Sequence, residues 1–242
     1  MPPGGDRASL RLHPADEALI AAVAAANPRT VVAVMTGSAV ITEGWRDEVA
    51  ALLVLWYPGM EGGLALADVL SGAHEPGGRL PCSFPARAED LPFFDRDATA
   101  ITYDLWHGYR KLDRDGAEPA FPFGFGLSYT TFSLGDLRLA ATVARSVAVA
   151  VTNTGAAAGD DVVQLYVEAP GSAVPRAPRE LKGFARVALA PGETRDVTIE
   201  VPVADLARYD PEAGWVLEPL EYVAVAPSSV AASRRSPREN VV

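Results

Sequence analysis

Two groups of aromatic and basic residues are the strongest candidates for chemistry in this sequence of 242 residues. Trp56 and Tyr57 are adjacent, and Trp106, Tyr109 and Arg110 share one short stretch. Flat aromatic faces beside a guanidinium that donates forked hydrogen bonds are the equipment with which proteins hold sugars. The same residue types also pack at the interfaces between domains, and this second interpretation stays open for each of them.

The other reactive side chains form no catalytic or metal-binding pattern. The histidines His13, His74 and His107 have no second ligand at a zinc-like spacing. Cys82 lies in the apolar stretch LPCSFP with no base beside it, and no Gly-x-Ser-x-Gly elbow occurs. The stretch GMEGG at 59–63 lacks a following lysine, so close packing of a helix on a strand explains it better than phosphate binding. The residues alone predict no catalytic group, no cofactor and no metal.

Charge and composition narrow the classes of partner. The formal net charge of -10 disfavours nucleic acids and anionic membranes, because both bind basic surfaces. A single cysteine permits no disulfide within the chain. No apolar run reaches the roughly 20 residues that span a bilayer, and the opening residues lack the pattern of a secretory signal. Localisation is therefore unknown from the sequence, with the cytoplasm as the default.

Residues 1–118 have the pattern of an α/β domain. Pro14 opens a predicted helix that stops at Asn27-Pro28, and a second helix is predicted over 61–70, ending near Gly72. Side chains at helical spacing are expected to face inward; they are Leu19, Ile20, Val23 and Ala24 in the first helix and Leu64, Ala67, Val69 and Leu70 in the second.

Strands are predicted between and after these helices. The continuous apolar runs at 30–35 and 50–57 are typical of strands buried on both faces, and 78–85 favours a further short strand. Elements in this order predict an α/β layer with a mostly parallel sheet. The run is short for a complete domain of this type, so we expect an incomplete α/β sandwich with further strands upstream.

Residues 133–226 have the period of two that is typical of β-strands. Together with 132–139, about seven strands recur at a spacing near 8–12 residues, which predicts an all-β sandwich of the immunoglobulin or fibronectin type III kind. The tail 227–242 shows no period and is expected to be mobile. The predicted strands are 132–139, 146–155, 161–169, 180–189, 194–201, 214–218 and 221–226.

An aromatic and glycine-rich joint, residues 119–132, lies between the two halves. Its prolines exclude a helix, and Gly124 and Gly126 interrupt a series of aromatic residues. We expect the glycines to permit a close backbone approach and the aromatic rings to pack between the domains.

Several long stretches resemble glycoside hydrolase family 3, the family of many β-glucosidases and β-xylosidases. Residues 6–40, the stretch WYPGMEGG at 56–63 and the stretch PFGFGLSYT at 122–130 are similar to signatures of that family in the same order. The stretch EPGGRLP at 75–81 resembles the family's Asn-Pro-x-Gly-Arg-Leu-Pro signature, with Glu75 in place of the usual asparagine. Three further stretches resemble the family's C-terminal fibronectin type III-like domain; they are 153–170, 179–194 and 214–222.

The resemblance implies a retaining glycosidase in which a barrel carries the nucleophilic aspartate. In that family a loop of the α/β domain carries an acid/base glutamate within a Glu-Gly-x-Asp-Arg stretch. Gly4, Asp6 and Arg7 match that stretch, but Pro3 stands at the glutamate position and has no proton to donate. We therefore expect no catalytic residue in this chain. The substrate-proximal candidates are Asp6, Arg7, Trp106, Tyr109 and Arg110.

Two functional hypotheses follow from these observations. In the first, the chain is the N-terminally truncated C-terminal portion of a β-glucosidase-like enzyme, which hydrolyses a β-linked glucoside or xyloside when complete and is inactive in this form. In the second, the chain is a non-catalytic carbohydrate-binding or scaffolding module that complements a separately encoded barrel. Either hypothesis leaves a sheet edge and an apolar face uncovered, so we expect the chain to bind the missing barrel or to self-associate.

Overall fold

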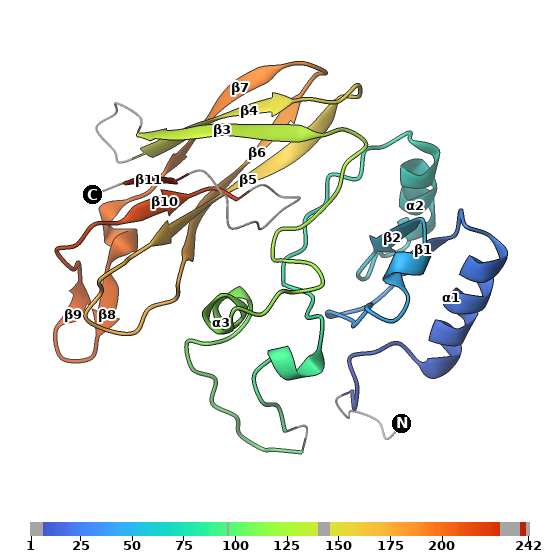
Figure 1. Cartoon of the computed structure of the whole chain (residues 1–242), viewed down its shortest axis with the longest axis horizontal. Coiled ribbons are helices and arrows are strands. Elements are labelled where there is room, and N and C mark those ends of the chain that lie inside the picture. Colours follow the sequence, from blue (N-terminus) through green and yellow to red (C-terminus); the bar gives the residue numbers. More distant parts are fainter. Residues whose placement is uncertain (1–6, 96, 140–145, 228–237, 241–242) are drawn as a thin grey trace. The chain divides into compact units, whose positions relative to one another are not determined.

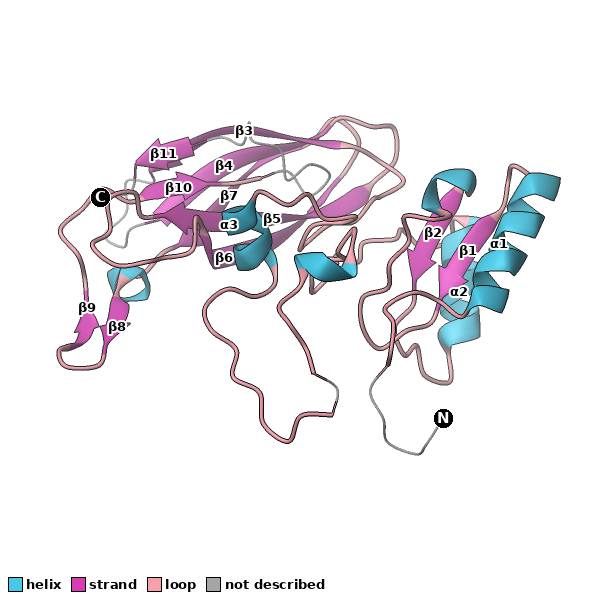
Figure 2. Cartoon of the chain, turned by 60° about the horizontal axis from the view of Figure 1, so that its bottom comes forward, coloured by secondary structure: helices cyan, strands magenta, loops and turns pink. Residues whose placement is uncertain are grey.

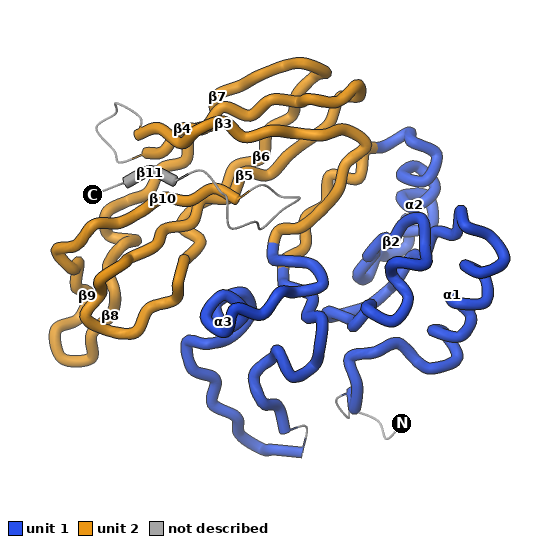
Figure 3. Tube along the Cα trace, in the orientation of Figure 1, with its two compact units in different colours: residues 1–74, 82–123 blue, residues 75–81, 124–242 orange. Residues whose placement is uncertain are grey.

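The computed structural model describes residues 7–95, 97–139, 146–227 and 238–240. The chain separates into two units, which Figure 3 colours separately: residues 1–74 with 82–123 form unit 1, and residues 75–81 with 124–242 form unit 2. The boundary after residue 123 lies inside the predicted joint. Residues 75–81 group with unit 2, although the sequence analysis assigned them to the first domain.

Helix α1 (Pro14–Ala26) begins and ends where the sequence predicts (Figure 1). Pro14 occupies its first turn, and Nδ1 of His13 accepts a hydrogen bond from the backbone N–H of Ala15 at 3.2 Å. Asn27 has left the helical conformation, although its N–H still donates to the carbonyl of Val23. His13 is therefore the N-cap of this helix, which is a structural role.

Two parallel strands form the sheet of unit 1 (Figure 2). They are β1 (Val31–Val34) and β2 (Ala51–Val54), with Val31 opposite Ala51. Helix α2 (Gly62–Ser71) ends at Gly72, whose φ of 78° is the left-handed cap expected of glycine. A short helix, α3 (Tyr109–Asp115), was not predicted. None of the described helices combines the length and apolar character needed to cross a membrane.

The parallel sheet is smaller than the sequence predicts. The expected strand at 78–85 is wrong: its only ladder pairing in the described structure is an isolated bridge between Phe84 and Phe121. Pro81 lies within this segment and Pro85 ends it, and each lacks the N–H that a strand would donate. The broad order of the chain, a parallel sheet followed by antiparallel sheets, agrees with the expectation.

The apolar faces of unit 1 are largely exposed, which contradicts the expected burial. Leu19 of α1 is 63% exposed, Leu64 of α2 is 67% exposed and Val31 of β1 is 42% exposed. Leu70 and Val23 are also exposed. A helical period identifies which face is apolar, but burial requires a second layer that the two described strands do not supply.

A small aromatic core holds unit 1 together. Trp45 and Phe84 are buried, and the ring of Phe84 lies edge-on to Trp56 at 6.1 Å and to Phe121 at 6.2 Å. The guanidinium of Arg46 lies 5.3 Å from the centre of the Phe121 ring. These contacts join the segment after β2 to residues 82–123 within the unit.

Unit 2 contains two antiparallel sheets and a separate hairpin (Figure 1). The strand order is β11-β10-β5-β6 in one sheet and β3-β4-β7 in the other, while β8 pairs with β9. The strands are β3 (Phe132–Leu139), β4 (Ser146–Asn153), β5 (Gly159–Glu168), β6 (Glu180–Leu189), β7 (Thr194–Glu200), β8 (Arg208–Asp210), β9 (Gly214–Val216), β10 (Val223–Val225) and β11 (Arg238–Asn240).

The two sheets share one apolar core. Alternate residues of β4, including Val149 and Val151, are buried in the same cluster as Val163 and Leu165 of β5. Tyr222, next to β10, is completely buried there. This is the burial expected of a sandwich, in which the inward residues of both sheets alternate with outward ones.

The predicted mobile tail contains ordered structure. Residues 238–240 form β11, which pairs antiparallel with β10. The period-two pattern needs several residues to be visible, so a strand of this length gives no signal in the sequence. Residues 228–237 and 241–242 lie outside the described part of the chain.

A buried ion pair explains why residues 75–81 group with unit 2. Nη2 of Arg79 lies 3.0 Å from Oδ1 of Asp161 on β5, and only 8% and 4% of the two side chains are exposed. The same nitrogen donates to the carbonyl of Asp160, and the N–H of Leu80 donates to the carbonyl of Phe125. Removal of one partner from a buried pair leaves an uncompensated charge, so this contact fixes the segment strongly.

The glycines of the joint permit a close approach, as expected. Gly124 has a φ of 77°, and a Cβ on it would lie 2.0 Å from Nε2 of the buried Gln164. A Cβ on Gly126 would lie 2.3 Å from the carbonyl oxygen of Gly78. Only glycine fits either place without displacement of its neighbours.

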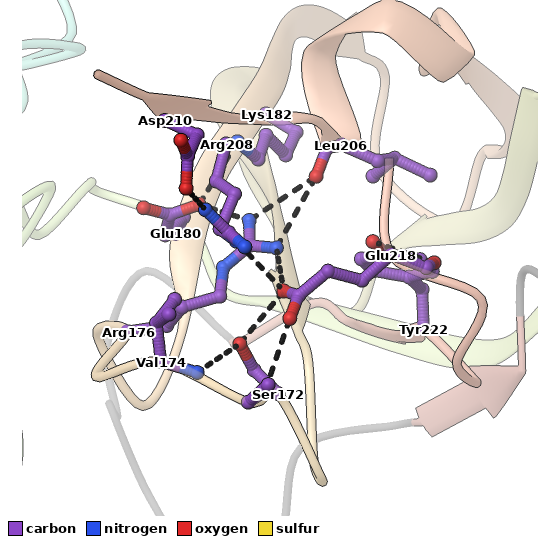
Figure 4. A network of polar contacts seen from close by, with 11 residues as sticks. Ser172, Val174, Arg176, Glu180, Lys182, Leu206, Arg208, Asp210, Glu218 and Tyr222 are labelled. Atoms are coloured by element: carbon purple, nitrogen blue, oxygen red, sulfur yellow. Dashed lines mark hydrogen bonds and ion pairs between the residues drawn. The ribbon is translucent and has the colours of Figure 1, made fainter. Parts of the chain in front are cut away.

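A polar network centred on the buried Glu218 ties a loop to the end of unit 2 (Figure 4). Its carboxylate accepts hydrogen bonds from Oγ of Ser172 at 2.7 Å and from the N–H of Ala173 at 3.0 Å. Arg176 and Arg208 approach it at 3.7 Å and 3.6 Å. The hydrogen bond from Ser172, followed by that from Ala173 and the two arginines, holds the pKa of Glu218 below its ordinary value against the opposing effect of burial.

We predict that alanine at Gly124 destabilises the fold more than alanine at Gly171. Both glycines have a positive φ, but nothing lies within 4 Å of a Cβ on Gly171. Gly171→Ala should therefore lower the free energy of unfolding by about 1–2 kcal/mol through backbone strain alone. Gly124→Ala adds the collision with Gln164 and should cost clearly more. Urea denaturation measures both, and equal losses would contradict the steric argument.

We predict that Glu218 contributes stability that is lost in acid. Because its pKa is lowered in the folded state, its contribution is fully present above the ordinary glutamate pKa and is lost as the pH falls through the lowered pKa. Glu218→Gln should lower the free energy of unfolding at neutral pH by about 1–3 kcal/mol. The difference in the free energy of unfolding between this variant and the unaltered chain should become smaller in acid. Glu221→Gln, an exposed neighbour, is the control and should change neither value.

Candidate functional site

The carboxyl edge of the β1–β2 pair brings together several residues able to contact a ligand. In parallel sheets the loops that follow the strands meet at this edge, and ligands bind there. The loop after β1 contains Gly37 and Ser38, and the loop after β2 contains Trp56 and Tyr57. Both loops belong to unit 1.

Arg7 attaches the N-terminal segment to this edge. Its Nη2 donates to Oγ of Ser38 and, at 3.0 Å, to the carbonyl oxygen of Ala39. A backbone hydrogen bond of 2.9 Å from Ile41 to the carbonyl of Leu10 adds a second attachment. Arg7 itself thus lies at the carboxyl edge of β1. Asp6, another predicted candidate, lies outside the described residues.

Tyr57 presents an aromatic ring at the same edge. It is 83% exposed, and its hydroxyl lies over Gly37, where an added Cβ would come within 2.2 Å of that oxygen. Trp56 precedes it with a φ of 51°, a left-handed conformation that costs a bulky residue about 1–2 kcal/mol. The ring of Trp56 packs against Phe84, whereas the ring of Tyr57, the next residue, is exposed.

The other three candidates lie around α3 and not at this edge. The guanidinium carbon of Arg114 lies 4.7 Å from the centre of the Trp106 ring. The ring centres of Tyr109 and Phe123 are 5.8 Å apart. Arg110 is half-buried in α3. In Figure 1, α3 lies apart from β1 and β2. Trp106 and Tyr109 therefore have packing partners in unit 1, whereas Arg7 and Tyr57 share the sheet edge.

The described carboxyl groups with a clearly shifted pKa are all poor proton donors at neutral pH. Hydrogen bonds from Arg114 and Lys111 lower the pKa of Asp115 to about 2. Burial raises the pKa of Glu180, but Lys182 and Arg176 outweigh it, so the net shift is downward. The pKa is also lowered in the remaining members, Glu193, Asp210 and Glu218. A general acid needs the opposite shift.

The thiol and the imidazoles also have structural explanations. Burial raises the pKa of Cys82, which keeps its thiol protonated and weakly nucleophilic. His13 caps α1, and Nδ1 of His107 lies 3.0 Å from the carbonyl oxygen of Asp104. Within the described ranges, no three His, Cys, Asp or Glu side chains gather to hold a metal ion.

Sequence reasoning missed Gly37 and Ser38. The only signal for them is their position in the stretch TGSAV, directly after an apolar strand, where small residues leave room at a sheet edge. Asp104 lies four residues before Gly108, where many family members have an acidic residue; its Oδ1 accepts from the N–H of Trp106 at 2.7 Å and shapes the turn before α3.

Two family profiles match the sequence. The profile of the Glycosyl hydrolase family 3 C-terminal domain matches residues 3–129, and that of the Fibronectin type III-like domain matches residues 161–230. In the structure the antiparallel sheets already begin at β3, ahead of the second match.

Curated relatives match most of the chain. A β-glucosidase of Rhizobium radiobacter is 44% identical over 224 residues, and β-glucosidase B of Emericella nidulans is 45% identical over 242 residues. These alignments cover 87% and 90% of this chain but only 27% and 28% of the relatives. The chain thus spans about a quarter of the length of the curated relatives it matches.

Solved structures give the same likeness. DesR, a β-glucosidase from Streptomyces venezuelae in complex with D-glucose, is 35% identical with a TM-score of 0.83. β-Glucosidase 3B from Thermotoga neapolitana is 34% identical with a TM-score of 0.86. Each comparison covers 98% of this chain, and 32% and 34% of the respective relative.

Proposed function

We infer the function of this chain from the family to which it belongs, glycosyl hydrolase family 3, and propose that it forms the C-terminal portion of a β-glucosidase-type enzyme. The complete enzyme would hydrolyse β-glucosidic bonds with retention. The names of its relatives support this reaction class, because the matched curated proteins and structures are β-glucosidases. The substrate and the activity belong to this proposal.

The attachment of Arg7 is the observation that carries the proposal. Arg7, the last residue of the stretch that matches the family's acid/base loop, is hydrogen-bonded to Ser38 and Ala39 in the loop that follows β1. Tyr57 lies at the same edge with its ring exposed. In this proposal the chain positions that loop and supplies one wall of the sugar site, while a barrel supplies the nucleophile.

We propose that the chain does not hydrolyse glycosides by itself. Retaining hydrolysis needs two carboxyl groups about 5–5.5 Å apart, one as nucleophile and one as acid/base. By the resemblance, the nucleophile belongs to the barrel and the acid/base position falls on Pro3, which has no titratable side chain. The lowered pKa values of Asp115, Glu180 and Glu218 support the same view, since such groups retain no proton for a leaving group.

We predict that a carboxyl group at position 3 restores acid catalysis. The experiment joins this chain to the preceding part of the Rhizobium radiobacter β-glucosidase, in place of the part it matches. Pro3→Glu should raise kcat on p-nitrophenyl β-glucoside by about 10²–10⁴-fold, the usual contribution of a general acid. The accompanying gain in kcat/KM, which reports departure of the leaving group, should be smaller with a dinitrophenyl leaving group, because that group departs without a proton.

Pro2→Glu is the matched control, because it adds the same charge one residue away, and it should not raise kcat. A fusion carrying Pro3 that is as fast as the Pro3→Glu variant would contradict the proposal. Turnover of aryl glucosides by the purified 242-residue chain, abolished by one substitution in it, would contradict the claim of inactivity.

The exposed apolar surface of unit 1 favours a second candidate function, that of a module which binds a separate barrel polypeptide. Met35 and Met60 at the sheet edge are 69% and 100% exposed, and Leu19 and Leu64 on the helices are similarly open to solvent. Apolar surface of this kind marks an interaction site or promotes aggregation. A barrel that covers it would complete the sugar site in trans.

We predict that the isolated chain self-associates and that this surface is responsible. Sedimentation velocity should show oligomers that increase with concentration, because burial of exposed leucine is favourable by about 1.5–3 kcal/mol per side chain. Leu64→Glu should shift the chain towards the monomer. Leu127→Glu, an exposed leucine of unit 2, should not. A chain that stays monomeric at high concentration would contradict the assignment.

A further inference from the structure

We infer that the β8–β9 hairpin of unit 2 is a carbohydrate-binding platform, with Tyr209 and Trp215 as its contact residues and a β-linked glucan as its ligand. The inference of a glucan rests on the proposed function. The site itself rests on the geometry of the hairpin, whose contact residues Tyr209 and Trp215 are not among the residues of the candidate site above.

The two aromatic residues occupy one face of the hairpin. Tyr209 on β8 is directly opposite Trp215 on β9, and the ring centres are 5.6 Å apart at an interplanar angle of 75°. Tyr209 is 63% exposed and Trp215 is 73% exposed. Leu217, two residues further along, is 44% exposed and extends the apolar strip on the same side of the chain.

A shallow open depression adjoins this strip. Residues 217–221 line it, with a volume of ≈ 510 Å³, and Leu217 belongs to both features. That volume is within the range of small-molecule sites. The strip and the depression together could accept a short extended chain of rings.

The hairpin does not need exposed rings to keep its shape. On its other side Nη1 of Arg208 lies 3.0 Å from Oδ2 of Asp210, and Arg208 also approaches Glu218 of the network in Figure 4. Oδ1 of Asp210 accepts from the N–H groups of Glu212 and Ala213 at 3.0 Å each, which closes the turn. These bonds fix the register and prepare the face on which the rings lie.

The size of the strip favours a small ring-shaped ligand over a protein. An aromatic side chain has about 150–250 Å² to bury, so the exposed parts of Tyr209 and Trp215 offer on the order of 300 Å². A stable protein interface needs about 800 Å² on each side. A pyranose ring, by contrast, places its C–H face on an aromatic ring and leaves its hydroxyls for water and neighbouring polar groups.

The charges around the strip disfavour a nucleic acid, whose bases also stack on aromatic rings. Glu212 and Glu221 are exposed beside it, and the charge of Arg208 is already matched by Asp210 and Glu218. Phosphates would meet these carboxylates, while Arg208, the described arginine of the hairpin, is already paired. A neutral glucan meets no such repulsion.

The test uses the full chain in affinity gel electrophoresis with soluble barley β-glucan, and titration calorimetry with cellohexaose. The unaltered chain should be retarded in the gel. Trp215→Ala and Tyr209→Ala should each weaken binding by about tenfold or more, which corresponds to the loss of one good ring contact. Trp215→Phe keeps an aromatic face and should retain most of the affinity.

Phe184→Ala removes another exposed ring of unit 2 and is the matched control that should bind normally. Thermal unfolding of each variant separates loss of the ring contact from loss of the fold. The inference is overturned if the unaltered chain is not retarded, if folded Trp215→Ala binds as well as the unaltered chain, or if dextran, an α-linked glucan, binds as tightly as β-glucan.

A separate readout distinguishes this inference from the proposed function. In the fusion that carries Pro3→Glu, Trp215→Ala should leave hydrolysis of the small aryl glucoside unchanged and weaken only the binding of the polymer. A fusion that binds β-glucan through Trp215 but hydrolyses nothing would sink the proposed reaction and support the platform. Loss of aryl glucoside hydrolysis in a folded Trp215→Ala fusion would overturn the platform as a separate site.

Discussion

Apolar surface must be covered by a second layer of structure, and the two units satisfy this constraint differently. In unit 2 the inward residues of two sheets cover one another, so that Val151 and Tyr222 are completely buried. In unit 1 two parallel strands and two helices leave Leu19 and Leu64 in water. Among the described residues, the first unit therefore leaves apolar side chains exposed, whereas the second buries them in its own core.

The same constraint explains how much of the fold the sequence could predict. Alternation along β4 and β7 identified those strands, because alternate residues of each are buried in the core that the two sheets share. The bounds of α1 and α2 followed from Pro14 and Gly72, whose backbone preferences are local. The burial of their apolar faces could not follow, because periodicity is a property of one element and burial is a property of two.

Contacts between residues that are distant in the sequence account for the other differences between the prediction and the structure. Arg79 and Asp161 are far apart in the sequence, and the residues around them give no signal of a buried ion pair. The sequence therefore did not predict that residues 75–81 group with unit 2. In the candidate site, the type of residue at Tyr57 was informative, but its exposure next to the packed ring of Trp56 was not predicted from the sequence. Trp106 looked equivalent in the sequence and instead has Arg114 against its ring.

Positioning and binding are achieved by different interactions in this chain, which is why they can be separated by mutation. Arg7 is held by hydrogen bonds to Ser38 and Ala39, which are directional and fix this residue relative to the sheet edge, as the proposed function requires. The β8–β9 hairpin offers flat rings, which hold a ligand by contact area and tolerate sliding along a polymer. A glycosidase needs directional hydrogen bonds around the bond that it breaks. Contact by area is sufficient where a long substrate is only retained. In the proposed function, proline at position 3 leaves the catalytic site without its proton donor and does not affect binding at the β8–β9 hairpin.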